Sequence, residues 1–232
     1  MPISRRTLLR AGASTGLLAA LAACGGKVQS SAIDKPSTAD SSQAEIGPLP
    51  AAAVNRTKFA MVGDSITKAS LKPLTAALDQ LGYTEIKIAA EVNRRIDVGD
   101  GRSEPLSGAK TMLKMISDGV TPDVWAIAMG TNDVGKYPDA AAYASLIDEM
   151  MSMPDSKLPI VWVDVYNPNQ LAGTKLFNVA LRDRAKARGN AAVLSWFNLA
   201  SNPKSKILRT DHIHPNDAGT LVFADLVSKA LA

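Results

Sequence analysis

The feature that most constrains the fold of this chain is the alternation, from Lys58 onward, of short apolar runs with longer amphipathic stretches. The apolar runs predict strands at residues 58–62, 86–91, 123–129, 159–165 and 192–196. The amphipathic stretches predict helices at residues 70–81, 106–117, 140–151, 173–187 and 217–231. Strands that alternate with helices form parallel sheets with helices on both faces. We therefore predict an α/β protein, a three-layer α/β/α sandwich with a flavodoxin-like five-stranded parallel sheet.

The length and composition suit one globular domain, which we place at residues 56–232. The chain has 232 residues, 46% of them hydrophobic and 21% charged, enough for one sizeable core. We expect it to be a monomer.

Residues 1–23 have the pattern of a signal peptide. Arg5 and Arg6 form a twin-arginine start, and an apolar run rich in Ala and Leu follows. The run ends in Leu21-Ala22-Ala23-Cys24, which resembles the bacterial lipobox. That resemblance implies lipidation of Cys24, export, and anchoring to the outer face of the bacterial cell membrane. An ordinary secretory signal and an uncleaved anchor helix are the alternatives.

Two further observations fit an exported lipoprotein. Cys24 is the only cysteine, so no intramolecular disulfide can form. Residues 24–55 are rich in Ser, Ala, Pro, Gln and Asp, which is typical of a flexible linker, although an ordered arm is the alternative.

The charge of the chain argues against a nucleic-acid partner. Removing the three arginines of the leader from the 26 basic residues leaves 23 against 22 acidic residues. A domain this close to neutral lacks the electrostatic attraction that nucleic-acid binding requires. We expect contact with the membrane through the lipid anchor only.

Two polar blocks directly follow predicted strands, where ligands bind in open α/β sheets. Gly63-Asp64-Ser65 follows the first strand and Gly130-Thr131-Asn132-Asp133 follows the third. Each block alone is also common in turns and helix caps. If the two strands are neighbours, the amide of Asn132 could point at the space that Ser65 faces and stabilise an oxyanion.

The only two histidines, His212 and His214, lie just before the last predicted helix, in Asp211-His212-Ile213-His214-Pro215. An Asp three residues before a His can fold back to hold the imidazole Nδ1–H, which prepares that His to act as a base. A metal site is the rival interpretation, but no clear third ligand is present. We predict no metal and no cofactor.

These three blocks, in this order, resemble the SGNH (GDSL-like) hydrolase family across residues 58–232. The resemblance implies that Ser65 is the nucleophile, His214 the general acid and base, and Asp211 its orienting partner. It also implies an oxyanion hole formed by the Ser65 backbone N–H, the Asn132 side chain and the backbone N–H of a glycine.

The glycine of the oxyanion hole is the position where the sequence departs from the commoner family pattern. Gly101 is favoured, because Gly101-Arg102-Ser103 followed by Gly108 resembles SGNH domains attached to membrane acyltransferases. Gly99 is the alternative, and both glycines could simply form a turn.

The resemblance leads to three hypotheses for function. The first is an exported serine esterase that removes small acyl groups, with acetyl esters of a cell-envelope glycan as the expected substrate. The second is an O-acyltransferase that passes the acyl group to a glycan hydroxyl. The third is a lipoprotein that binds a glycan or a protein without catalysis.

Overall fold

A computed structural model describes residues 56–98 and 106–232 of the chain. Its elements in chain order are β1 (Lys58–Gly63), α1 (Ser65–Ala69), α2 (Leu71–Gln80), β2 (Glu85–Ala90), α3 (Gly108–Ser117), β3 (Val124–Ala128), α4 (Ala140–Ser152), β4 (Ile160–Val163), η2 (Pro168–Gln170), α5 (Leu171–Arg188), β5 (Ala191–Leu194), α6 (Trp196–Ala200) and α7 (Asp217–Lys229). The five strands form one parallel sheet in the order β2-β1-β3-β4-β5. The predicted α/β fold with a five-stranded parallel sheet is confirmed.

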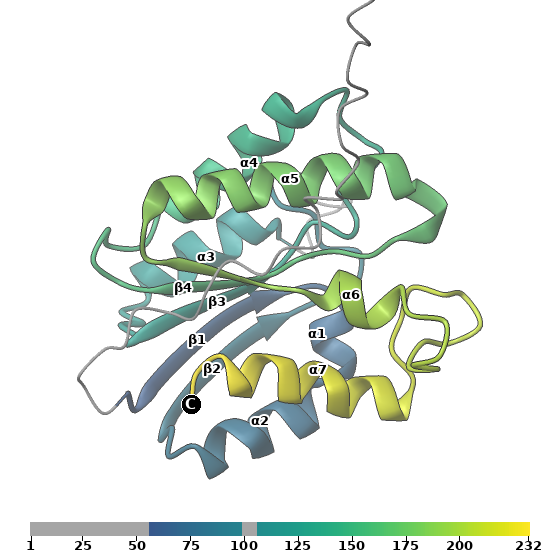
Figure 1. Cartoon of the computed structure of the whole chain (residues 1–232). Coiled ribbons are helices and arrows are strands. Elements are labelled where there is room, and N and C mark those ends of the chain that lie inside the picture. The colour runs from purple at the N-terminus through teal and green to yellow at the C-terminus, as the bar shows by residue number, and fades with distance from the viewer. Residues whose placement is uncertain (1–55, 99–105) are drawn as a thin grey trace, which may run out of the picture. The chain divides into compact units, whose positions relative to one another are not determined.

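Helices cover both faces of the sheet. Helices α3, α4 and α5 lie on one face, and α2 and α7 lie together on the other (Figure 1). Successive side chains of each strand point to opposite faces. In β1, for example, Ala60 and Val62 pack with the α3, α4 and α5 side, whereas Phe59 and Met61 pack with the α2 and α7 side. The sheet therefore separates two hydrophobic cores, as the three-layer prediction requires.

The inner strands are apolar on both faces because helices cover both. Every residue of the inner strands β3 and β4 is buried, and so are the last five of β1 and all four of the edge strand β5. The edge strand β2 differs, since Glu85 and Lys87 are exposed and alternate with partly buried isoleucines. Charged side chains on an edge strand oppose pairing with another chain.

The fourth and fifth strands both end two residues earlier than the sequence predicts, and the end of the fifth strand has a clear local cause. The predicted strand included Ser195 and Trp196, but β5 ends at Leu194 and α6 begins at Trp196. The Ser195 hydroxyl is the reason: it accepts a hydrogen bond from Asn198 N and caps α6. Trp196 is nevertheless buried, against Phe223 of α7.

The order in which the chain adds strands to the sheet changes direction at β1. The chain passes from β1 to β2 on one side and then returns to β3 on the other side of β1. Ligands of open α/β sheets bind outside the carboxyl ends of the strands at such a reversal. Gly63 pairs with Ala128 at the ends of β1 and β3, so the two polar blocks of the sequence emerge side by side.

Several predictions from the sequence fall on residues outside the described ranges. They concern the signal peptide, Cys24 and the linker, and both candidate glycines, Gly99 and Gly101. Within residues 56–98 and 106–232, no helix has the length and apolar character needed to cross a membrane.

The turn after β3 provides a test of packing at the sheet edge. Gly130 has φ +122°, and a Cβ there would lie 2.4 Å from the ring of Phe177. That ring packs between Tyr143 and Trp162, so it has little room to move. We expect Gly130→Ala to lower the free energy of unfolding by about 1–3 kcal/mol more than the control Gly119→Ala.

Gly119 is a suitable control because it also has a positive φ, +83°, but nothing lies within 4 Å of a Cβ there. Urea denaturation of both variants would measure the difference. Equal losses would mean that Phe177 yields and that only the backbone conformation matters.

Candidate active site

Ser65 is the first residue of α1, directly after the turn that follows β1. The Asp64 side chain caps this helix by accepting a hydrogen bond from Ile66 N at 2.9 Å. Gly63 is required before the turn, because a Cβ there would lie 2.2 Å from Thr67 Oγ1. Asp64 is fully buried, whereas Ser65 is partly exposed. The turn therefore presents the serine hydroxyl at the carboxyl end of the central strand.

Asp211 and His214 lie in a tight loop before α7. Asp211 Oδ1 accepts hydrogen bonds from the backbone N–H groups of Ile213, at 2.9 Å, and of His214, at 3.0 Å. His212 adopts the left-handed conformation, with φ +59°, which lets the loop close on itself. Asp211 Oδ2 lies 2.8 Å from His214 Nδ1. The spacing of three residues thus forms the predicted Asp–His pair.

In the structure, the side chains of Ser65, His214 and Asp211 are joined by two consecutive hydrogen bonds. Ser65 Oγ and His214 Nε2 are 2.9 Å apart. A carboxylate can only accept hydrogen bonds, so Nδ1 of His214 carries the proton that faces Asp211. In the neutral imidazole, Nε2 then has its lone pair toward Ser65 and accepts the hydroxyl proton. This is the arrangement a histidine needs to activate a serine.

The local hydrogen bonds keep Asp211 ionised. Partial burial raises the pKa of Asp211. Hydrogen bonds from the backbone N–H groups of Ile213 and His214 and from the His214 side chain outweigh this effect, and the pKa falls to about 2. The carboxylate therefore stays charged at neutral pH. Its side chain is 46% exposed, so position in the loop and not burial holds it beside His214.

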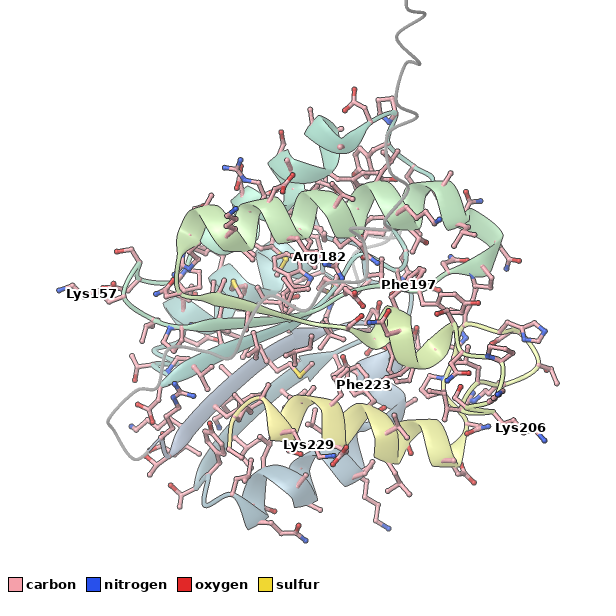
Figure 2. The ribbon with its side chains drawn as sticks, viewed as in Figure 1. Lys157, Arg182, Phe197, Lys206, Phe223 and Lys229 are labelled. Atoms are coloured by element: carbon pink, nitrogen blue, oxygen red, sulfur yellow. The ribbon has the colours of Figure 1, made fainter. Side chains whose placement is uncertain are left out.

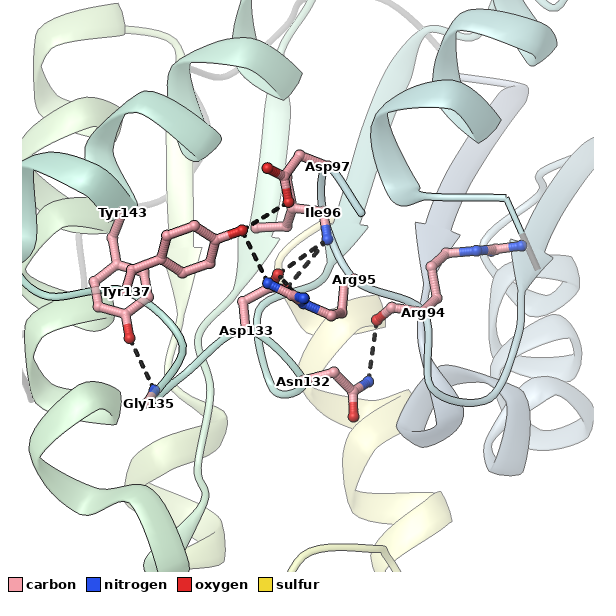
Figure 3. Close-up of polar contacts among 9 residues, drawn as sticks. All are labelled: Arg94, Arg95, Ile96, Asp97, Asn132, Asp133, Gly135, Tyr137 and Tyr143. Carbon is pink, nitrogen blue, oxygen red and sulfur yellow. Dashed lines mark hydrogen bonds and ion pairs between the residues drawn. The ribbon is translucent and has the colours of Figure 1, made fainter. Parts of the chain in front are cut away.

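Asn132 follows β3 and is partly exposed at the same sheet edge. Its side-chain Nδ2 donates a hydrogen bond to the backbone carbonyl of Arg94 at 3.0 Å (Figure 3). That contact identifies the NH₂ end of the amide and uses one of its two hydrogens. The second hydrogen remains for another acceptor, as an oxyanion donor would require.

The second histidine does not join this group. His212 is exposed, and no described hydrogen bond of its side chain ties it to Ser65 or Asp211. Among the described residues, no three side chains of His, Cys, Asp or Glu lie together in a way that could hold a metal ion.

Two buried polar groups near the site had no role in the sequence prediction. Asp164 directly follows β4 and accepts hydrogen bonds from Phe197 N, at 2.7 Å, and from Arg182 Nη2, at 2.9 Å. Arg182 reaches it from α5, pointing toward the sheet (Figure 2). Burial raises the pKa of Asp164 to about 6, although these donors lower it. The sequence prediction placed Asp164 inside the fourth strand, residues 159–165, whereas β4 ends at Val163. A charged residue near the end of an otherwise apolar run was the signal that could have found it.

The second group is centred on Asp133, whose sequence block was recognised only for Asn132. Burial raises the pKa of Asp133 to about 6, against the lowering effects of Ile96 N–H and Arg95. Both partners lie in the segment that follows β2, far from Asp133 in sequence. No local pattern could have predicted this pairing.

Comparison with solved structures places the fold among known hydrolases. The lipase/acylhydrolase from Enterococcus faecalis is 16% identical, with a TM-score of 0.60, covering 75% of this chain and 95% of that one. Esterase EstA from Pseudoalteromonas sp. is 14% identical, with a TM-score of 0.59, covering 75% and 96%. The C-terminal catalytic domain of peptidoglycan O-acetyltransferase A from Streptococcus pneumoniae is 18% identical, with a TM-score of 0.60, covering 76% and 93%. No curated protein sequence matches this chain.

The parallel sheet, with its serine turn after β1 and its Asp–His loop before α7, defines an α/β protein with the SGNH hydrolase fold. The sequence agrees, since residues 61–221 match the model of the GDSL-like lipase/acylhydrolase family. The chain belongs to that family, whose members are hydrolases that act on ester bonds.

The buried carboxyl of Asp64, the residue before Ser65, allows a test of how its raised pKa affects stability. Burial raises its pKa to about 6, although the N–H of Ile66 and the Thr131 hydroxyl lower it. A carboxyl whose pKa is raised on folding binds its proton more tightly in the native state. Its contribution to stability is therefore present at low pH and decreases as the pH rises through 6. Asp64→Asn keeps the capping oxygen and cannot ionise.

We expect the stability of Asp64→Asn, relative to wild type, to be greater at pH 7.5 than at pH 5. Asp64→Ala should be about 1 kcal/mol less stable than Asp64→Asn, because it removes the cap. Urea denaturation at both pH values measures these differences. A stability difference between Asp64→Asn and wild type that does not change with pH would contradict the assignment.

Proposed function

We propose that this protein is a serine esterase that removes small acyl groups from a cell-envelope glycan through an acyl-enzyme intermediate. The single observation that supports this most strongly is the contact of Ser65 Oγ with His214 Nε2 at 2.9 Å, with Asp211 2.8 Å from Nδ1. A nucleophile, a base and a group that orients the base are then within hydrogen-bond reach.

In the first half of the proposed reaction, Ser65 attacks the ester carbonyl. His214 Nε2 takes the hydroxyl proton as the Oγ–C bond forms, and the carbonyl oxygen becomes an oxyanion. The imidazolium is stabilised by the ionised Asp211, which does not itself take the proton. His214 then gives the proton to the leaving alcohol oxygen as the ester C–O bond breaks, which leaves Ser65 acylated.

In the second half, water replaces the alcohol. His214 takes a proton from the water as its oxygen attacks the acyl carbon. The bond to Ser65 Oγ then breaks, Oγ receives the proton from His214, and the carboxylic acid is released. Each proton transfer therefore passes between His214 and Ser65, the leaving alcohol or water.

We propose three donors for the oxyanion. The Ser65 backbone N–H lies in the first turn of α1, where N–H groups have no acceptor within the helix. Asn132 supplies the second hydrogen of its Nδ2, and Gly101 is proposed for the third donor. Loss of one such donor typically lowers kcat by about 10²- to 10³-fold.

An open site supports a substrate that is carried on a polymer. The side chains of His214 and Asp211 are 36% and 46% exposed, and Ser65 is also partly exposed. An ester on the surface of a large glycan can reach such a site without entering a deep channel. We propose in addition that lipidated Cys24 holds the domain outside the cytoplasm, where envelope polymers lie.

A second candidate is transfer of the acyl group to a glycan hydroxyl in place of water. The similarity to the catalytic domain of the streptococcal peptidoglycan O-acetyltransferase favours it. Both candidates use the same acyl-enzyme, so they differ only in the acceptor of the second half.

Hydrolysis of a short-chain chromogenic ester by the purified protein tests the proposed chemistry. We expect Ser65→Ala to lower kcat by about 10⁴-fold or more, because no other described residue is placed to form the acyl-enzyme. His214→Asn should lower it comparably. The control His212→Asn changes the neighbouring exposed histidine to a residue that tolerates its positive φ, and we expect it to retain activity.

Equal rates for wild type and Ser65→Ala would refute the esterase proposal and leave a binding role. Mass spectrometry of the acylated serine in a rapidly quenched reaction would identify the intermediate directly.

Product analysis separates the two candidates. With an acetylated donor and an envelope glycan present, we expect free acetate as the main product. Accumulation of newly acetylated glycan, dependent on Ser65, would instead establish transfer.

A further inference from the structure

Two adjacent side chains bind the segment of residues 94–96, one as a hydrogen-bond donor and the other as an acceptor. Asn132 Nδ2 donates to the carbonyl oxygen of Arg94 at 3.0 Å. Asp133, the next residue, accepts from Ile96 N with both carboxylate oxygens, at 3.3 and 3.2 Å. The turn after β3 and the segment of residues 94–96 are therefore fixed to each other at two points (Figure 3).

Asp133 is the buried centre of this contact. Its side chain has no exposed surface, and Arg95 Nε donates to its Oδ1 at 3.2 Å. The Arg95 guanidinium lies 5.6 Å from the centre of the Tyr137 ring, and its Nη2 donates to the Tyr137 hydroxyl at 2.9 Å. That hydroxyl donates to Asp97 at 2.8 Å. A buried carboxylate held this way is costly to disturb, because its removal leaves buried donors without an acceptor.

The other end of the segment is fixed by the side chain of Arg94. Its guanidinium donates to the carbonyl groups of Gly63, at 3.1 Å, of Ala89, at 2.7 Å, and of Leu106, at 3.1 Å. These acceptors belong to the end of β1, to β2 and to the approach to α3. The Arg94 carbonyl is thus held between two anchors, with the sheet on one side and Asp133 on the other.

The Arg94 carbonyl determines which way the Asn132 amide faces. A carbonyl accepts only from the NH₂ end of an amide, so it prevents the amide from rotating by half a turn. In the rotated amide, the side-chain oxygen would take the place of the donor and repel an oxyanion. A donor fixed before the reaction stabilises developing charge without reorganisation.

We propose that Asp133 is a positioning residue for the proposed oxyanion donor Asn132. It acts through Ile96 N–H and Arg95, which fix the Arg94 carbonyl, which in turn fixes the Asn132 amide. The proposal rests on the esterase function proposed above and goes beyond it, since it gives a role to a residue that does not touch the substrate.

A double-mutant cycle between Asp133 and Asn132 tests this role. We expect Asp133→Ala to lower kcat for the chromogenic ester by about 10- to 100-fold with KM changed less than about 3-fold, because misplacement of the donor affects the transition state. In the Asn132→Ala background the same change should lower kcat by less than about 3-fold, since no donor remains to be positioned. Asp133→Asn, which keeps one acceptor oxygen, should recover part of kcat.

A second variant keeps the test decisive if Asp133→Ala does not fold. Arg95→Met removes the cation that holds Asp133, and the Arg95 side chain is 23% exposed. Because this change only loosens the contact, we expect kcat to fall by about 3- to 10-fold. The loss should again appear only when Asn132 is present. Asp148→Ala is the matched control, because it removes the partly exposed ion pair of Asp148 on α4 with Arg184 on α5 and should leave kcat unchanged.

The outcomes separate the two proposals. Equal losses of kcat with and without Asn132, or no loss in either background for both variants, would overturn the positioning role of Asp133. Activity that does not depend on Ser65 would overturn the esterase proposal itself.

Discussion

The pairing of β1 with β3 is the constraint on which the site depends. Five pairs of residues, from Phe59 with Val124 to Gly63 with Ala128, align the two strands in parallel. Both strands therefore end at the same edge of the sheet, and Asp64 N donates to the Ala128 carbonyl just beyond the pairing. Without this alignment, Ser65 and Asn132 would lie at different positions along the strand direction, and they could not both contact one substrate.

At this edge of the sheet, a buried aspartate follows each of three buried strands. Asp64, Asp133 and Asp164 follow β1, β3 and β4, and each accepts a backbone N–H, from Ile66, Ile96 and Phe197 respectively. Chain turns at a buried edge leave N–H groups that must find acceptors. Burial raises the pKa of each carboxyl to about 6, so the local hydrogen bonds are made at an electrostatic cost. Asp64 and Asp133 hold the turns that present Ser65 and Asn132, whereas Asp164 holds the start of α6.

The sequence predicted what depends on local pattern. Apolar runs identified all five strands, and the three-residue spacing of Asp211 and His214 predicted their contact, because each depends on neighbours along the chain. It did not predict the end of β5, where a single hydroxyl of Ser195 converts strand into helix. The contact between Asp133 and Ile96 was also missed, since 37 residues separate them and only the folded sheet brings them together.

The two halves of the proposed machinery are held by different means. Asp211 and His214 are partly exposed, and a self-contained turn of backbone hydrogen bonds orients them. Asn132 is oriented instead by a buried network that spans three strands and the segment of residues 94–96. A base must exchange protons with substrate and water, which an exposed loop permits. An oxyanion donor gains its effect from being fixed before charge develops, which a buried scaffold provides. The division therefore follows from the different physical demands on a proton carrier and on a hydrogen-bond donor.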